Sequence, residues 1–387
     1  MNSLGVYLHF PWCLAKCPYC DFASYPATRE EIPHERYADA IVRELAERAS
    51  ALEQSLATIF IGGGTPSLWS RAALGRVLAA VRSTLAPRDP ADPPVEITVE
   101  CNPSSFDERA ATELLEVGVN RVSIGVQSLD QERLTFLGRL HDASGAVAAL
   151  RAAERAGFKR ISADLIFGVE GGKPQSPADA AREARAVAEL GLTHVSAYGL
   201  TIEPGTAFGE LHRKGRLPIA PDERIVDSFF AIEEVLESFG LEHYEISNYA
   251  RPGEESRHNL GYWRGHDYLG LGVSAVGCVN ARRYKNQKDP GRYLRAVLEA
   301  RGPLEMESED LDPETRLRER IMLGLRLRDG FDLEAAAREL GIERAARERE
   351  PALARLVKLG RVERDGTRVR VARHARALTD GIAADLF

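Results

Sequence analysis

The stretch Val6-Tyr-Leu-His-Phe-Pro-Trp-Cys-Leu-Ala-Lys-Cys-Pro-Tyr-Cys20 joins a short apolar run to three closely spaced cysteines. The run Val6–Phe10 is typical of a buried strand. The chain has 387 residues and only five cysteines, and its first residues lack the basic start and apolar core of a secretory leader. We therefore expect no disulfide framework, and clustered thiols in such a chain indicate a metal site or a catalytic site.

The three clustered cysteines, Cys13, Cys17 and Cys20, have the spacing C-x3-C-x2-C. Three thiolates on one loop can hold three irons of a [4Fe-4S] cluster and leave the fourth iron without a protein ligand. That open iron can chelate the amino and carboxylate groups of a methionine. A zinc site with His9 or Asp21 as fourth ligand is the alternative, but zinc more often uses paired C-x2-C knuckles. The spacing favours the cluster.

Short apolar runs alternate with helical patterns as far as about residue 200. The predicted strands are Val6–Phe10, Thr58–Ile61, Val95–Glu100, Arg121–Val126, Arg160–Phe167 and Thr193–Tyr198. The predicted helices between them are Tyr37–Leu52, Ala72–Val81, Glu108–Val117, Ala143–Ala156 and Pro177–Leu190. Strands that alternate with helices indicate a parallel sheet with right-handed crossovers. Six such units predict an α/β fold, a partial (β/α)6 barrel of the TIM type.

The remainder of the chain predicts a second, smaller domain. A barrel domain over residues 1–300 is expected to be followed by a winged-helix-like α+β module over 301–387, with a hairpin turn at Asp365-Gly366. The Pro- and Asp-rich stretch 86–94 is predicted to be a surface loop. The net charge of −7 and the interleaved signs in the module argue against nucleic-acid binding. No apolar run approaches the ~18 residues needed to span a bilayer, so a cytoplasmic location is expected.

Glycines and polar residues gather where the predicted strands end. Gly62-Gly63-Gly64-Thr65-Pro66 follows the second strand. Glu100, Gln127 and Tyr198-Gly199 lie at the ends of later strands, and Asp164 lies on the fifth strand. Barrel enzymes assemble their sites at this end of the strands. Glycines there also let the backbone approach a ligand closely.

These motifs together resemble the radical SAM superfamily, and within it the oxygen-independent coproporphyrinogen III oxidase-like family. The resemblance implies a [4Fe-4S] cluster on the three cysteines with S-adenosylmethionine (SAM) beside it, and no catalytic residue is assigned. It also implies that Tyr7 lies against the cluster and that Glu100 holds the ribose hydroxyls. The other SAM contacts that it implies are Gly63, Gly64, Thr65, Gln127, Arg139, Asp164 and Gly199. For Arg139, a salt bridge with Glu100 or Asp164 is the alternative.

Two departures separate this chain from the oxidase itself. The oxidase has a further cysteine two positions after the third ligand, where this chain has Cys20-Asp21-Phe22, and only twelve residues precede Cys13. The run Arg257-His-Asn-Leu-Gly-Tyr-Trp263 instead resembles the H-N-x-x-Y-W motif of the haem chaperone branch of the family. A neutral imidazole is a good axial ligand for haem iron, so His258 is the predicted haem ligand. The alternative is that His258 only orders a loop.

The resemblance therefore implies a haem chaperone of the radical SAM type that passes haem to haem-requiring proteins, including membrane respiratory enzymes. The cluster and SAM would support assembly, homodimer formation or release, with transient membrane contact at an acceptor. The alternative is a coproporphyrinogen III dehydrogenase, in which reductive SAM cleavage gives a 5′-deoxyadenosyl radical that initiates propionate decarboxylation. The changed cysteine pattern and the H-N-x-x-Y-W run favour the chaperone.

Overall fold

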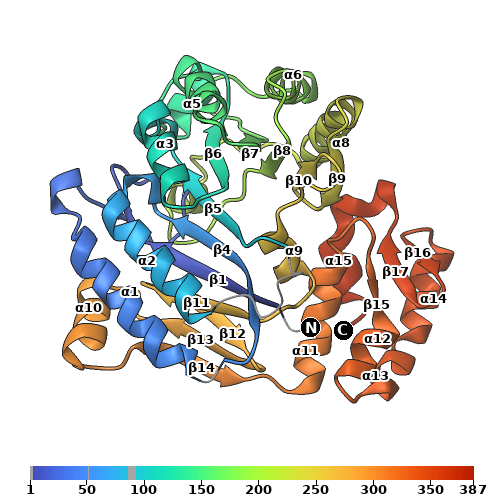
Figure 1. Cartoon of the computed structure of the whole chain (residues 1–387). Helices are drawn as coiled ribbons and strands as arrows, with labels where there is room; N and C mark the ends of the chain where they lie inside the picture. Colours follow the sequence, from blue (N-terminus) through green and yellow to red (C-terminus); the bar gives the residue numbers. More distant parts are fainter. Residues whose placement is uncertain (1–2, 51, 86–92) are drawn as a thin grey trace.

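The computed structural model describes residues 3–50, 52–85 and 93–387, and its core is a run of six parallel strands (Figure 1). Neighbouring strands pair in parallel from the first to the last, in chain order. Their bounds are β1 (Ser3–Phe10), β4 (Ser55–Gly63), β5 (Glu96–Cys101), β6 (Arg121–Gln127), β7 (Arg160–Phe167) and β8 (His194–Gly199). The predicted partial (β/α)6 barrel is confirmed, and each predicted strand overlaps an observed one.

Further strands extend both edges of this parallel core. β11 (Tyr268–Gly272) pairs in parallel with β1, and β12 (Val276–Val279), β13 (Arg282–Asn286) and β14 (Glu305–Asp310) follow it antiparallel. At the other edge, β10 (Asn248–Ala250) and β9 (Glu242–Glu245) add to β8. The result is a twelve-stranded sheet that runs in order from β14 to β9. The short strands β2 (Trp12–Cys13) and β3 (Tyr25–Pro26) pair beside it.

Helices follow the core strands and cover the outer face of the sheet (Figure 1). Local chemistry sets their ends: α5 begins where Asp142 accepts from the amide of Gly145, and it ends at Gly157, whose φ is 108°. The predicted helix Ala143–Ala156 is confirmed at both ends. The other helices of this domain are α1 (His34–Ala49), α2 (Arg71–Thr84), α3 (Glu108–Glu116), α4 (Gln131–Phe136), α6 (Pro177–Ala188), α7 (Ala207–Arg213), α8 (Asp222–Ser238), α9 (Arg257–Trp263) and α10 (Pro290–Glu299).

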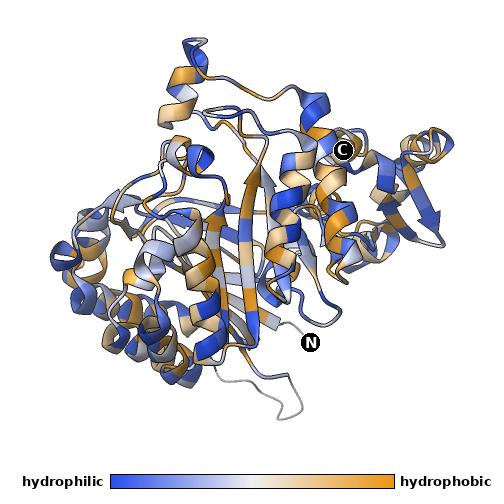
Figure 2. Ribbon diagram, turned by 90° about the horizontal axis from the view of Figure 1, so that it is seen from above, coloured by the Kyte–Doolittle hydropathy of each residue, from blue (hydrophilic) through white to orange (hydrophobic). Residues whose placement is uncertain are grey.

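Apolar residues concentrate on the strands, and polar residues concentrate on the outer turns of the helices (Figure 2). No helix in the described part of the chain is long and apolar enough to cross a bilayer. Residues 86–92, most of the predicted surface loop, lie outside the described residues.

The C-terminal module has its own hydrophobic cluster, which includes Leu317, Leu353 and Val369. It packs beside the barrel, and buried Glu233 of α8 accepts from Arg373 and Arg376 across the contact. β14 is hydrogen-bonded in the main sheet, so the module's own elements begin after it. Those elements are α11 (Pro313–Gly324), β15 (Phe331–Asp332), α12 (Leu333–Glu339), α13 (Glu343–Glu348), α14 (Glu350–Lys358), β16 (Val362–Asp365), β17 (Arg368–Val371) and α15 (Thr379–Ala384).

Glu44 of α1 hydrogen-bonds to residues of β11, β13 and α10, at the edge of the sheet beyond β1. This fully buried carboxylate accepts from Arg48, Asn286, Tyr293 and the amide of Gly272. We expect Glu44→Ala to lower the free energy of unfolding by about 3–5 kcal/mol, because it leaves buried donors without a partner and removes one of the two carboxylates that pair with Arg48.

Urea denaturation of Glu44→Ala measures this loss, and Glu47→Ala on the same helix is the matched control. Within the described part of the chain, the Glu47 carboxylate forms only an exposed pair with Arg43, so its removal should cost less than about 1 kcal/mol. Equal losses for the two variants would contradict the role given to Glu44.

Candidate cofactor site

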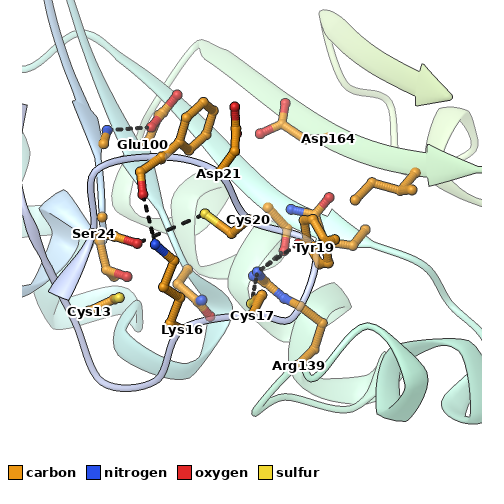
Figure 3. A pocket seen from close by; sticks show the side chains of 18 of the residues that line it. Cys13, Lys16, Cys17, Tyr19, Cys20, Asp21, Ser24, Glu100, Arg139 and Asp164 are labelled. Carbon is orange, nitrogen blue, oxygen red and sulfur yellow. Dashed lines mark hydrogen bonds between the residues drawn. The ribbon is translucent and has the colours of Figure 1, made fainter. Parts of the chain in front are cut away.

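The three clustered cysteines lie on the loop that leaves β1, and all of them line one cavity of about 460 Å³. Figure 3 shows Cys13, Cys17 and Cys20 around one side of this cavity, with Glu100 and Asp164 on the strands across from them. The parallel strands all end here, so the loop and the strand ends face one another. The cavity is large enough to hold a small-molecule ligand.

The donor set at this loop fits an iron–sulfur cluster better than a zinc ion. No group of three or more His, Cys, Asp or Glu side chains surrounds a single ion position within the described ranges. A cube needs no such convergence, because each thiolate binds a different iron. The zinc alternative also loses its candidate ligand His9, whose Nε2–H donates to the carbonyl of Ala23 at 2.9 Å while Nδ1 accepts from Tyr7 at 3.0 Å.

The surroundings of the thiols are partly polar. The Arg139 guanidinium lies 3.5 Å from the Cys17 sulfur and 3.4 Å from the Tyr19 hydroxyl, and it donates to the carbonyl of Gly125. It forms no salt bridge with Glu100 or Asp164 in the described part of the chain, so that alternative is wrong. Burial raises the pKa of the Cys13 and Cys20 thiols, and binding to a metal would still deprotonate them.

Close backbone approach requires the two glycines at the end of β4. Gly63 has a φ of 112°, and a Cβ there would lie 2.6 Å from the His9 ring. A Cβ on Gly64 would lie 2.5 Å from the carbonyl oxygen of Trp12. The glycines therefore let the end of β4 pass directly beside the cysteine loop, which brings Thr65 to the cavity wall.

Glu100 and Asp164 are two half-buried carboxyl groups that face the same cavity. Burial, and next the nearby Asp164, raise the pKa of Glu100 to about 8, although the amide of Gly63 donates to it at 3.2 Å. Burial also raises the pKa of Asp164, against hydrogen bonds from Ser123 at 2.9 and 3.1 Å. Such a pair favours a ligand that brings a positive charge or several hydroxyl donors.

Gln127 ends β6 in a conformation that is uncommon for a residue other than glycine. Its φ is 66°, and the register between β6 and β7 shifts between Ile124 and Gln127. Strained backbone of this kind concentrates at ligand sites, where it aims a side chain. Gln127 lines the cavity, as the sequence predicted.

The structure brings together all of the predicted site residues except Tyr7 and His258. Those that line the cavity are Cys13, Cys17, Cys20, Gly63, Gly64, Thr65, Glu100, Gln127, Arg139, Asp164 and Gly199. Tyr7 points into the barrel, and its hydroxyl donates to His9, which in turn bonds the cysteine loop. Its contact with the loop is therefore indirect.

His258 lies elsewhere, on α9, and its side chain is turned into the barrel interior. It is 3 % exposed, and its ring stacks on Phe60 at 5.1 Å between centroids. Nδ1 is 2.7 Å from the Thr58 hydroxyl and Nε2 is 3.0 Å from the Tyr262 hydroxyl. In this conformation neither nitrogen is free to bind iron, so the described arrangement does not fit a haem ligated by His258.

The sequence reasoning missed several cavity residues, of which Ser123 is the clearest. It lies on β6 and donates to both oxygens of Asp164. The signal was present, because a serine at an alternate position of an otherwise apolar strand points into the barrel. Asn102 and Thr201 also line the cavity.

Glu100→Gln tests the role of the carboxylate. With a pKa of about 8, Glu100 is neutral below that pH and offers a full charge only above it. SAM affinity of the cluster-loaded protein should therefore rise between pH 6 and 8, by at most about tenfold per pH unit. Glu100→Gln should remove this rise and weaken binding at pH 8.5 by roughly tenfold or more.

Anaerobic equilibrium binding of SAM to wild type and Glu100→Gln over this pH range tests the predicted pH profile. Glu203→Gln, at another position of the same cavity wall, is the control and should keep the wild-type profile. An unchanged affinity and pH profile in Glu100→Gln would show that Glu100 does not contact the ligand.

A cysteine loop at the mouth of a partial parallel barrel defines the radical SAM class of protein. The radical SAM superfamily profile matches residues 7–184, and the HemN C-terminal domain profile matches residues 311–378. The chain is 35% identical to heme chaperone HemW of Mycobacterium tuberculosis over 100% of its length and 95% of that protein. It is 41% identical to heme chaperone HemW of Escherichia coli over 72% of this chain and 71% of the relative. The chain therefore belongs to the HemW family of radical SAM proteins.

The fold is also that of the solved coproporphyrinogen III oxidase (HemN) of Escherichia coli. That structure superposes with a TM-score of 0.81 at 24% identity, over 100% of this chain and 90% of that one. At this identity the likeness shows the fold and nothing about the reaction. Membership of the radical SAM class implies a [4Fe-4S] cluster and SAM.

Proposed function

We propose that this protein is a haem chaperone that binds haem and passes it to haem-requiring proteins, including respiratory enzymes. The similarity to heme chaperone HemW of Mycobacterium tuberculosis along the entire chain carries this proposal. The H-N-x-x-Y-W run at residues 258–263 supports it from the sequence. The protein would act in the cytoplasm, with brief contact at membrane acceptors.

In this proposal the cavity at the strand ends is the resident cofactor site. Cys13, Cys17 and Cys20 would hold the cluster, and Glu100 with Asp164 would hold the SAM nucleoside. When bound, the cluster supplies an open iron that chelates SAM and can pass it an electron. The residues of the chain position the two groups, and Arg139 balances charge beside Cys17.

Haem is the cargo, and His258 is its proposed axial ligand. The buried position of His258 means that the haem-bound state differs from the described conformation around α9. Tyr262 and Trp263 offer flat apolar faces for the porphyrin in that state, and nearby arginines can pair with its propionates.

An anaerobic haem titration of the cluster-reconstituted protein tests the proposal. We expect a saturable spectrum with a stoichiometry of about one haem per chain, because one motif supplies one axial imidazole. A featureless rise in absorbance that never saturates would reject specific haem binding. Turnover of coproporphyrinogen III in the same preparation would indicate the dehydrogenase instead.

A further inference from the structure

The described conformation buries the very imidazole that haem binding requires, and that contradiction points to movement of α9. His258 has three hydrogen bonds here: Nδ1 with Thr58, Nε2 with Tyr262, and its backbone amide to Glu96 at 3.1 Å. Its ring also stacks on Phe60 of β4. An iron atom cannot reach either nitrogen while these contacts persist.

We propose that α9 is a latch that closes the barrel end opposite the cofactor cavity, and that its release exposes His258 to haem. This inference rests on the proposed haem function and adds the conformational step that this function needs. The closed latch is the haem-free state. Haem selects the open state, so its apparent affinity is lower than its intrinsic affinity by the fraction of open molecules.

The sequence in and around α9 favours a helix that can detach from the barrel. α9 has seven residues and contains Gly261, and a helix this short is not stable by itself. Glycines in the left-handed region lie on both sides of it, Gly253 at φ 86° and Gly265 at φ 68°. Such positions can absorb a change in backbone direction.

There is also space on the other side of α9. A cavity of about 910 Å³ lies between α9 and the C-terminal module, and its lining includes Leu260, Trp263 and Arg264 of the motif region. The module contributes Arg320 and Phe331 to the opposite wall. A His258 side chain released from the barrel therefore has an adjacent cavity lined by the rings of Trp263 and Phe331 and by four arginines and four acidic residues, of which Arg320 and Glu339 form an ion pair. The aromatic rings suit an apolar macrocycle, and the arginines can pair with its two carboxylates.

Thr58→Val tests whether α9 opens or stays permanently in the closed position. Valine keeps the shape of threonine but removes the hydrogen bond to Nδ1, so it destabilises the closed state without touching α9. We expect haem to bind about tenfold more tightly, which corresponds to one lost buried hydrogen bond. Thr98→Val is the matched control, because the Thr98 hydroxyl is buried in the same barrel and has no hydrogen-bond partner among the described residues.

A second variant, Gly5→Ala, places a methyl group against the His258 ring. A Cβ on Gly5 would lie 3.3 Å from the His258 ring and 3.2 Å from the Thr58 hydroxyl. Gly5→Ala should therefore also raise haem affinity. It gives an independent measurement if Thr58→Val folds poorly.

The reactivity of His258 toward a chemical reagent measures opening of the latch without haem, so a failure of the latch can be distinguished from a failure of the haem function. Diethyl pyrocarbonate should modify His258 faster in Thr58→Val and Gly5→Ala than in wild type or Thr98→Val, as mass analysis of the peptide would show. If wild type binds no haem but this order holds, the haem function fails and the latch stands. If the four proteins react equally at His258, or if wild type binds haem and Thr58→Val binds it with the same affinity, the latch is overturned.

Discussion

Cys17→Ser is expected to abolish cluster assembly and, with it, SAM binding. Cys17 lies in the middle of the three-cysteine loop, beside Arg139, and a serine oxygen is a poor substitute for a thiolate on iron. After anaerobic reconstitution, iron content and the visible absorbance of the cluster should fall from one cluster per chain to roughly none. SAM affinity should fall as well, because the open iron that chelates its methionine end is lost.

Cys278→Ser is the matched control for this change. Cys278 lies on β12 and does not line the cofactor cavity. The Cys278→Ser variant should therefore retain wild-type iron content and SAM affinity. Loss of the cluster from Cys278→Ser, or its retention in Cys17→Ser, would place the cluster elsewhere.

His258→Ala is expected to weaken haem binding. It removes the only axial ligand that the account assigns, so haem affinity should fall at least tenfold, equivalent to about 1.4 kcal/mol. The absorbance spectrum of any residual complex should also lose the features of imidazole ligation. Spectral titration under anaerobic conditions measures both effects.

Folding and non-specific binding need separate controls for this variant. Thermal melting shows whether loss of the buried ring unfolds the barrel end, and SAM binding at the opposite end should remain at the wild-type level. His212→Ala, at an exposed position on α7, should bind haem as wild type does. Equal haem spectra for His258→Ala and wild type would remove His258 from the haem site.

Much of the partial barrel could be predicted from the sequence, because its strands are short apolar runs separated by amphipathic helices. Arg160–Phe167 and Ala143–Ala156 agree with the structure at both ends. The start of α1 was predicted three residues late, because the first turn carries polar residues that have no apolar periodicity. The antiparallel pairing at the two edges of the sheet was not predicted, since it depends on distant strands.

The site could be predicted where a motif or strand end marked it, as at Cys13, Gln127 and Asp164. The orientation of His258 could not be predicted, because a histidine in a short helix can face either solvent or core. Burial among Thr58, Phe60 and Tyr262 is a tertiary property. The spacing of H-N-x-x-Y-W does place His258 and Tyr262 one turn apart, which explains their mutual hydrogen bond.

The most direct test of the chaperone account is the kinetics of haem transfer from the loaded protein. The cluster-reconstituted, haem-loaded chain is mixed anaerobically with increasing amounts of a haem-free b-type cytochrome, and the shift of the Soret band is followed in time. The account predicts a transfer rate that rises with cytochrome concentration and exceeds the rate of haem loss to haem-free myoglobin, because transfer then occurs within a complex. A rate that is independent of the acceptor and equal to the loss to myoglobin would contradict it, because haem would then be leaving by simple dissociation.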